Sequence, residues 1–338
     1  TTPSAPVVVS PINYCQGATA VPLTATGTAL LWYTTATGGT GSATAPTPST
    51  STAGSTSYYV SQTLSCGESP RAEIIVIVNP IPPAPTGTTP VTYCQGAAAA
   101  PLTATGTALL WYTTATGGTG STTAPTPSTA SPGNTIYYVS QTLNGCEGPR
   151  LAITVTIIAT PSAPGVTTPV TYCQGAAAVP LTATGTALLW YTTATGGTGS
   201  ATAPTPSTST AGSTTYYVSQ TVNGCESPRS SIVVTVNAIP AAPGVTTPVT
   251  YCQGAAAVPL TATGTALLWY TTATGGTGSA TAPTPSTSTA GSTTYYVSQT
   301  VNGCESPRSS IVVTVNAIPA APGVTTPVTY CQGAAAVP

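Results

Sequence analysis

Histidine, lysine, aspartate, methionine and phenylalanine are all missing from this sequence, and only 3% of its 338 residues are charged. Without histidine, the chain has no imidazole for acid–base catalysis or for a common type of zinc site. Its four basic residues are isolated arginines, whereas nucleic-acid binding requires clustered cations. We therefore expect no nucleic-acid binding, no metal or cofactor site, no catalytic residue and no enzyme activity.

Long apolar runs are missing as well. Hydrophobic residues make up 41% of the chain, but no stretch reaches the ~18 consecutive apolar residues of a membrane-spanning helix. The start of the chain does not resemble a signal peptide, which says nothing against secretion if the chain is an internal or mature fragment. We expect no membrane insertion.

The sequence is built from repeats of 79 residues. Segments 165–243 and 244–322 are identical, and the tryptophans recur at this spacing. We predict four domains, followed by the start of a truncated fifth at 318–338, and we interpret the chain as part of a longer array. The predicted domains are residues 1–80, 81–159, 160–238 and 239–317.

Each repeat has the pattern of a β-domain. In the third repeat, short runs rich in Thr, Val and Tyr lie between turn residues such as Gly196-Gly197 and Asn223-Gly224, the latter a favoured hairpin turn. Weaker strands are expected around 170–173 and within 199–210. The stronger predicted strands are Val179–Gly185, Leu188–Thr193, Thr215–Val222 and Ser231–Val236.

Six or seven strands in fewer than 80 residues are typical of a small antiparallel β-sandwich of the immunoglobulin type. The proline-rich segment 238–243 is predicted to be a short, stiff spacer that cannot continue a sheet. The predicted fold class is therefore all-β: tandem immunoglobulin-like antiparallel β-sandwich domains, joined head to tail in a fibre.

The repeat also resembles a known family. Cys173-Gln174-Gly175, the Leu-Leu-Trp-Tyr run at 188–191 and Asn223-Gly224-Cys225-Glu226 are similar to the Ig-like repeats of large surface proteins from Bacteroidetes-type bacteria. The resemblance extends over essentially every repeat. It implies an Ig-like fold and a cell-surface or secreted location, with type IX export and a role in adhesion or gliding. It implies no catalysis.

Each repeat carries one cysteine before the Leu-Thr-Ala-Thr run and one after the Tyr-Tyr-Val run. A metal site is the rival interpretation, but the chain lacks His, Asp and any Cys-x-x-Cys pair. We expect disulfides, and hence an oxidising, extracellular compartment. The cysteines concerned are Cys15, Cys66, Cys94, Cys146, Cys173, Cys225, Cys252, Cys304 and Cys331.

The pairing of these cysteines has two solutions. Bonds within a repeat, such as Cys173–Cys225, are the simpler one. In an Ig-type sandwich, however, the two cysteines lie at opposite poles, roughly 23 Å apart for a strand of about seven residues, whereas a disulfide needs Cα atoms within ~7 Å. Bonds between consecutive repeats avoid this problem, and we favour them slightly. They would be Cys15–Cys146, Cys94–Cys225 and Cys173–Cys304.

The first repeat departs from the pattern, because Ser65-Cys66-Gly67 replaces Asn-Gly-Cys. This places its cysteine one residue closer to the preceding tryptophan, and we expect a local adjustment of the loop.

The aromatic residues have structural and functional interpretations. A single tryptophan on a central strand is most often a core anchor, although a sugar-stacking platform is the alternative. Tyr216 and Tyr217 face opposite sides of their strand, so we expect one buried and one exposed side chain that could touch glycans or other fibres. The expected core anchors are Trp32, Trp111, Trp190 and Trp269.

Three further motifs have simple interpretations. The glycine-rich run 194–199 lacks the lysine of a phosphate-binding loop and is predicted to be a hairpin turn. Glu226 and Arg229 form an expected surface pair worth about 0–1 kcal/mol. The Ser/Thr/Pro run 203–210 resembles an O-glycan carrier.

We therefore expect a structural extracellular filament or adhesin stalk reinforced by disulfides. Its expected partners are neighbouring repeats, other copies of the same fibre and glycans, attached or bound. Two alternatives are a repetitive carbohydrate-binding adhesive module and the spacer of a larger secreted enzyme.

Overall fold

The computed structural model describes residues 2–337, and every regular element in this range is a β-strand. The chain divides into two compact units. Unit 1 comprises Thr1–Pro161 and the hairpin tip Asn223–Cys225, and unit 2 comprises Ser162–Val222 and Glu226–Pro338. None of the described residues belongs to a helix that could span a membrane. The predicted all-β class is confirmed.

Repeats 1 and 2 share the strands of the main sheet. The strands of repeat 1 are β1 (Val7–Val8), β2 (Ile12–Cys15), β3 (Ala25–Thr26), β4 (Leu30–Tyr33), β5 (Gly54–Leu64), β6 (Gly67–Glu68) and β7 (Ala72–Asn79). Those of repeat 2 are β8 (Val91–Cys94), β9 (Leu109–Tyr112), β10 (Gly133–Leu143), β11 (Cys146–Glu147) and β12 (Leu151–Ile158). The two-stranded sheet β1-β3 of repeat 1 is reduced in repeat 2 to a bridge between Thr86 and Thr105.

Repeats 3 and 4 follow the same plan. The strands of repeat 3 are β13 (Gly165–Val166), β14 (Val170–Cys173), β15 (Ala183–Thr184), β16 (Leu188–Tyr191), β17 (Gly212–Val222), β18 (Cys225–Glu226) and β19 (Ser230–Asn237). Those of repeat 4 are β20 (Gly244–Val245), β21 (Val249–Cys252), β22 (Ala262–Thr263), β23 (Leu268–Tyr270), β24 (Gly291–Ser298), β25 (Thr300–Val301), β26 (Cys304–Glu305) and β27 (Ser309–Asn316).

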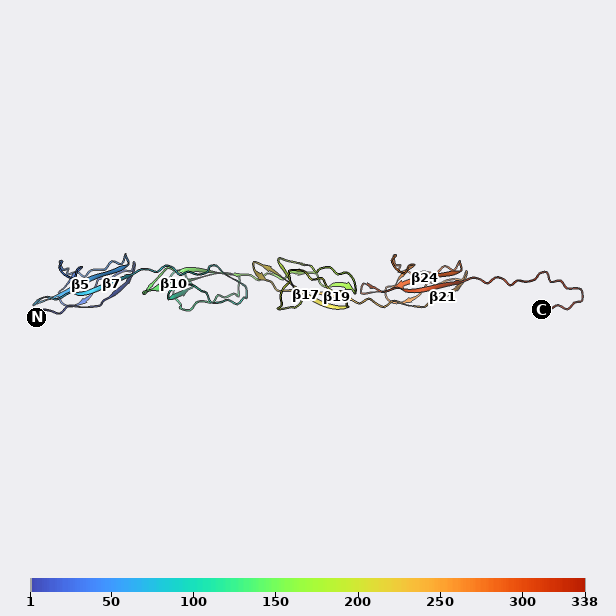
Figure 1. The fold of residues 1–338 in the computed structure, drawn as a ribbon, viewed down its shortest axis with the longest axis horizontal. Coiled ribbons are helices and arrows are strands. Elements are labelled where there is room, and N and C mark those ends of the chain that lie inside the picture. The colour runs from blue at the N-terminus through green and yellow to red at the C-terminus, as the bar shows by residue number, and fades with distance from the viewer. Residues whose placement is uncertain (1, 338) are drawn as a thin grey trace. The chain divides into compact units, whose positions relative to one another are not determined.

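One main sheet organises each repeat. In repeat 3 its order is β14-β19-β17-β16, and β17 and β19 pair antiparallel (Figure 1). The short β14 pairs parallel to β19, with Cys173 opposite Asn237. Repeat 1 has the same order, β2-β7-β5-β4, and β5 and β7 lie side by side in Figure 1. The main sheet is thus antiparallel except for its first strand.

The second layer is mostly irregular. Of the predicted strand Val179–Gly185, only Ala183–Thr184 is regular, and it pairs with β13. The expected weak strand within 199–210 is reduced to a bridge between Ser200 and Trp190. Pro204 and Pro206 have no backbone N–H to donate and so cannot sustain a ladder. Single backbone bonds hold the layer instead, such as Leu181 N–H to the Pro204 carbonyl at 2.9 Å.

The core lies between the main sheet and this irregular layer. In repeat 3, Leu181 and Trp190 pack with Val218, Ile232 and Val234, all of them buried. Side chains of β19 alternate between the core and the outer face, as the period of a strand requires. Each tryptophan is only 5% exposed, which leaves no ring face free for sugar stacking.

The hairpin turns explain the irregular cysteine of repeat 1. Asn223 and Gly224 have φ values of 51° and 80°, the conformation of a tight turn that suits glycine. In repeat 1, Leu64 pairs with Gly67, as Leu143 pairs with Cys146 in repeat 2. The hairpin keeps its length, but its turn changes conformation. Asn144 and Gly145 have positive φ values, whereas Ser65 and Cys66 do not, and Gly67 has a φ of 112° instead. The expected local adjustment of the loop is confirmed. Cys66 occupies the turn position of Gly145, and glycine takes the strand position.

The side chains of β12 in repeat 2 alternate between the core and the outer face, which allows a matched test of the core. Ile153 is fully buried, whereas its neighbour Thr154 lies on the opposite face of β12. We expect Ile153→Ala to destabilise repeat 2 by about 2–5 kcal/mol, because it leaves a cavity, and Thr154→Ala by less than about 1 kcal/mol. Hydrogen exchange followed by mass spectrometry resolves this repeat, because the peptides around Ile153 occur nowhere else in the sequence. Equal losses of protection in the two variants would contradict the described core.

Candidate functional site

Three disulfides join consecutive repeats. Each connects the first cysteine of one repeat to the second cysteine of the next, with Cα atoms 5.5–5.6 Å apart. Bonding within a repeat, the simpler of the two solutions, does not occur. The pairs are Cys15–Cys146 and Cys94–Cys225 in unit 1 and Cys173–Cys304 in unit 2.

Three of the nine cysteines depart from the expectation that all form disulfides. Cys66, Cys252 and Cys331 are free and exposed thiols in the described chain. Cys66 differs further from its counterparts, because its turn position leaves it exposed, whereas Cys146, Cys225 and Cys304 are each about 1% exposed.

Sheet register prevents a disulfide within a repeat. Cys173 ends β14 beside Asn237, at the end of the sheet where β17 begins. Cys225 follows the other end of β17, a strand of 11 residues. At ~3.4 Å per residue the two cysteines are roughly 35 Å apart, far beyond the ~7 Å limit for bonded Cα atoms.

Polar contacts accompany two of the disulfides. In unit 2, the Asn237 side-chain amide donates a hydrogen bond to the Asn302 carbonyl at 3.0 Å. In unit 1, Asn79 makes the same contact with Asn144 at 3.4 Å. Repeat 2 has Ile158 at this position, so the Cys94–Cys225 bond lacks the amide contact.

The disulfides close long and overlapping loops. Each has a sequence separation of 131 residues, for which the chain-entropy model gives about 5 kcal/mol of stabilisation per bond taken alone. Cys94 lies inside the loop closed by Cys15 and Cys146, and Cys173 lies inside the loop closed by Cys94 and Cys225. Consecutive repeats are therefore linked by two covalent routes, the main chain and a disulfide.

A second recurrent cluster surrounds the glutamate of each repeat. In repeat 3, the Tyr191 and Ser219 hydroxyls both donate to Glu226 Oε1 at 2.6 Å. The Arg229 guanidinium lies 3.2 Å from the centre of the Tyr191 ring, and its Nη1 donates to the Thr193 carbonyl at 2.7 Å. The same contacts recur with Glu68, Glu147 and Glu305.

This cluster replaces the surface ion pair expected between Glu226 and Arg229. Tyr191 lies between the two charges, so the arginine contacts the ring and not the carboxylate. Hydrogen bonds from Ser219 and then Tyr191 hold the pKa of Glu226 below its usual value, and Arg229 lowers it slightly further against the effect of burial. The cluster ties the β17–β18 hairpin to β16.

The tyrosine pair also differs from the expectation of one buried and one exposed ring. Tyr216 packs against the core and Tyr217 lies on the other face, yet both are half-buried. The run 194–199 forms a loop between β16 and Ser200 in which Gly196 and Gly197 have positive φ values.

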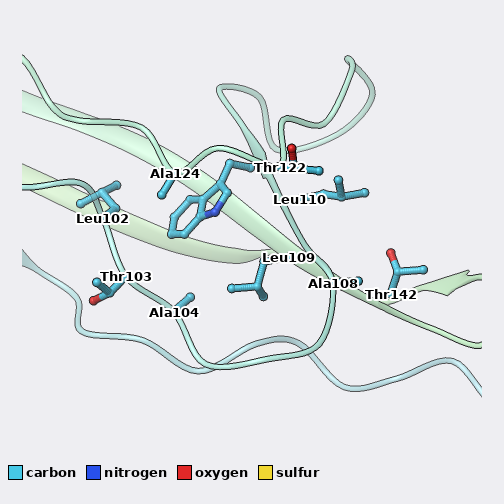
Figure 2. A pocket seen from close by; sticks show the side chains of 10 residues that line it. Leu102, Thr103, Ala104, Ala108, Leu109, Leu110, Thr122, Ala124 and Thr142 are labelled. Atoms are coloured by element: carbon cyan, nitrogen blue, oxygen red, sulfur yellow. The ribbon is translucent and has the colours of Figure 1, made fainter.

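Repeat 2 has an open apolar hollow beside Trp111, with a volume of about 730 Å³. Leu102, Ala104 and Leu109 line it (Figure 2). Val8, Val166 and Val245 pack on the cores of the other repeats, whereas repeat 2 has Gly87 at the equivalent position. A side chain there would come within 3.2 Å of the Thr103 carbonyl, at the edge of this hollow.

A smaller groove recurs beside the Trp-Tyr strand. Its volume is about 390 Å³ in repeats 1 and 3 and about 370 Å³ in repeat 2, and three threonines and one serine line it in each of these repeats. Within residues 2–337, no group of three or more Cys, Asp or Glu side chains is arranged to hold a metal ion. Each glutamate cluster contains a single carboxylate, whereas most glycoside hydrolases use a pair.

Sequence comparison gives the family. The model described as "Ig-like domain CHU_C associated" matches four times, at residues 3–80, 82–158, 161–237 and 240–316. The chain belongs to this family. Four tandem CHU_C-associated Ig-like domains that carry three disulfides are consistent with an extracellular or cell-surface protein. The search of curated proteins produced no match.

Solved structures with a similar layout include Sidekick-1 immunoglobulin domains 1–4, at 12% identity and a TM-score of 0.24, covering 92% of this chain and 99% of that one. The protocadherin GammaB4 extracellular domain has 12% identity and a TM-score of 0.26, covering 93% and 67%. The Clostridium thermocellum CbhA fibronectin(III)-like modules have 17% identity and a TM-score of 0.29, covering 45% and 91%. Scores this low carry no functional argument.

The glutamate cluster predicts a specific dependence on pH. Because the folded-state pKa of each clustered glutamate is lowered, the stabilisation is complete above the unfolded-state pKa of ~4.3 and is lost as the pH falls through the folded-state value. We expect the urea midpoint to decrease below about pH 4. Substituting Glu68, Glu147, Glu226 and Glu305 by Gln should flatten this decrease.

The control is Glu73→Gln, which removes the one glutamate outside these clusters, an exposed side chain on β7. It should leave the acid dependence in place. If the urea midpoint decreased equally steeply with falling pH in the fourfold variant and in the native chain, the clusters would not link protonation to folding.

Proposed function

We propose that this chain is a load-bearing extracellular stalk in which disulfides carry tension past the folded domains. The observation that supports this is the overlapping bonding of consecutive repeats. The bonds create a short covalent path through the chain, and the length of that path limits how far the stalk can be stretched.

The path alternates between main chain and disulfides. From Cys15 it crosses to Cys146, follows β12, β13 and β14 to Cys173, and crosses to Cys304. A second path crosses from Cys94 to Cys225 and follows β19, β20 and β21 to Cys252. In repeat 3 the two paths run side by side, as the parallel strands β14 and β19.

The lengths of the two routes differ by an order of magnitude. Between Cys15 and Cys304 the main chain has roughly 290 residues and would extend to about 1,000 Å. The disulfide path has only about 27 residues, from Cys146 to Cys173, and reaches at most ~95 Å. The path already runs through extended strands, so unfolding a domain outside it adds no length.

The surface supports an extracellular setting. The chain has a net charge of −1, and exposed hydroxyls at Thr205, Ser207 and Ser209 are available for O-glycans. A surface with so little charge repulsion also favours lateral association with other copies. The family resemblance supports export to the bacterial surface by the type IX route and a role in adhesion.

Pulling a single molecule by its two ends tests this function. We expect the oxidised chain to show no extension step on the scale of a repeat, whereas the reduced chain should release up to ~28 nm for each ~79-residue repeat. Steps of equal length in both states would contradict a load path through disulfides.

Two double variants provide a matched comparison. Replacing Cys15 and Cys146 by Ser should lengthen the shortest covalent path by roughly 100 residues, or about 350 Å. Replacing Cys94 and Cys225 by Ser should leave the maximum extension of the chain unchanged. The shortest covalent path runs through Cys15–Cys146 and Cys173–Cys304 and does not use the Cys94–Cys225 bond.

A further inference from the structure

The groove beside the Trp-Tyr strand has nearly the same volume in three repeats, about 370–390 Å³. In repeat 3 its lining includes Thr192, Thr198, Ser200, Thr202, Trp190 and Tyr216. The Ser200 hydroxyl donates to the Thr202 carbonyl at 3.2 Å. Repeat 4 carries the same residues, because residues 244–322 repeat 165–243. The array therefore presents one chemical environment several times.

The polar groups of this groove are available to a ligand. Thr192, Thr198 and Thr202 are exposed. Neither the Trp190 indole N–H nor the Tyr216 hydroxyl makes a hydrogen bond within residues 2–337, and every fully buried polar side-chain atom there has a partner. Neither donor is therefore fully buried.

The chemistry of the lining selects a neutral, polyhydroxylated ligand. Hydroxyl groups both donate and accept hydrogen bonds, as sugar hydroxyls require. The half-buried Tyr216 adds an apolar ring with a polar hydroxyl. None of the lining residues is charged, so an anionic ligand would be desolvated without a counter-charge. The volume lies at the lower end of small-molecule pockets, which suits a sugar residue.

We propose that each groove binds a residue of a neutral polysaccharide and that the repeats bind one polysaccharide chain multivalently. Linked weak sites can raise the apparent affinity by about 10²–10⁴-fold without any new contact. This site differs from the exposed tyrosine row expected from the sequence, because it centres on the threonines that follow the Trp-Tyr strand. The inference is independent of the proposed load path.

Affinity electrophoresis of the oxidised chain in gels containing dextran, mannan, xyloglucan or hydroxyethyl cellulose tests this proposal, with alginate as the anionic counterpart. We expect at least one neutral polysaccharide to retard the chain. A fourfold variant should weaken this retardation about five-fold for each groove engaged, the effect of losing one hydrogen bond. The variant replaces Thr40, Thr119, Thr198 and Thr277 by Val.

The matched control changes threonines of the same loop that do not line the groove. It replaces Thr37, Thr116, Thr195 and Thr274 by Val and should bind within about two-fold of the native chain. If the first variant alters tryptophan emission, and hence the fold, a second set that keeps the rings decides the result. That set replaces Tyr137, Tyr216 and Tyr295 by Phe.

Four results would overturn the proposal. The first two are no retardation by any neutral polysaccharide and retardation by alginate alone. The third is an equal loss of retardation in the first variant and in the control. The fourth is self-association of the chain that only the first variant abolishes. The last result would make the groove a contact between copies of the chain.

Discussion

The parallel pairing of β14 with β19 is the constraint on which the rest of the structure depends. It places Cys173 beside Asn237 at one end of the sheet, while the 11-residue β17 carries the chain to Cys225 at the other end. The two cysteines of a repeat are too far apart to bond. Each can only bond to a cysteine of an adjacent repeat, and this turns a series of small domains into a covalently continuous array.

Much of this arrangement follows from sequence. The Leu-Leu-Trp-Tyr strand, the Asn223-Gly224 turn and the opposite positions of the two cysteines are all predictable from local pattern and strand length. The irregular second layer is harder to predict. Val179–Gly185 alternates like a strand, but only Ala183–Thr184 finds a partner strand, and the local sequence does not show which residues will be paired. The Tyr191–Glu226–Ser219 cluster depends on sheet register between residues as many as 35 positions apart, and no single repeat reveals it.

The low charge of the chain acquires a structural explanation. Each repeat has one arginine and one glutamate in the same cluster, where they fix the end of a hairpin. In repeats 2 to 4 this hairpin carries a bonded cysteine. The remaining surface is dominated by threonine and serine, which suits both a neutral stalk and the proposed recognition of neutral sugars. The mechanical and binding proposals concern separate parts of the repeat. The two ends with the bonded cysteines carry the tension, and the loop beside the tryptophan binds the ligand.

Trypsin digestion without reduction tests the inter-repeat disulfides most directly. The chain has one arginine in each repeat, at Arg71, Arg150, Arg229 and Arg308, and no lysine. After free thiols are blocked and the chain is denatured, the pairing described here predicts one covalent species containing 1–71, 72–150, 151–229 and 230–308, with 309–338 released. Five separate peptides would mean that no cysteines bond between repeats, and the load path would not exist.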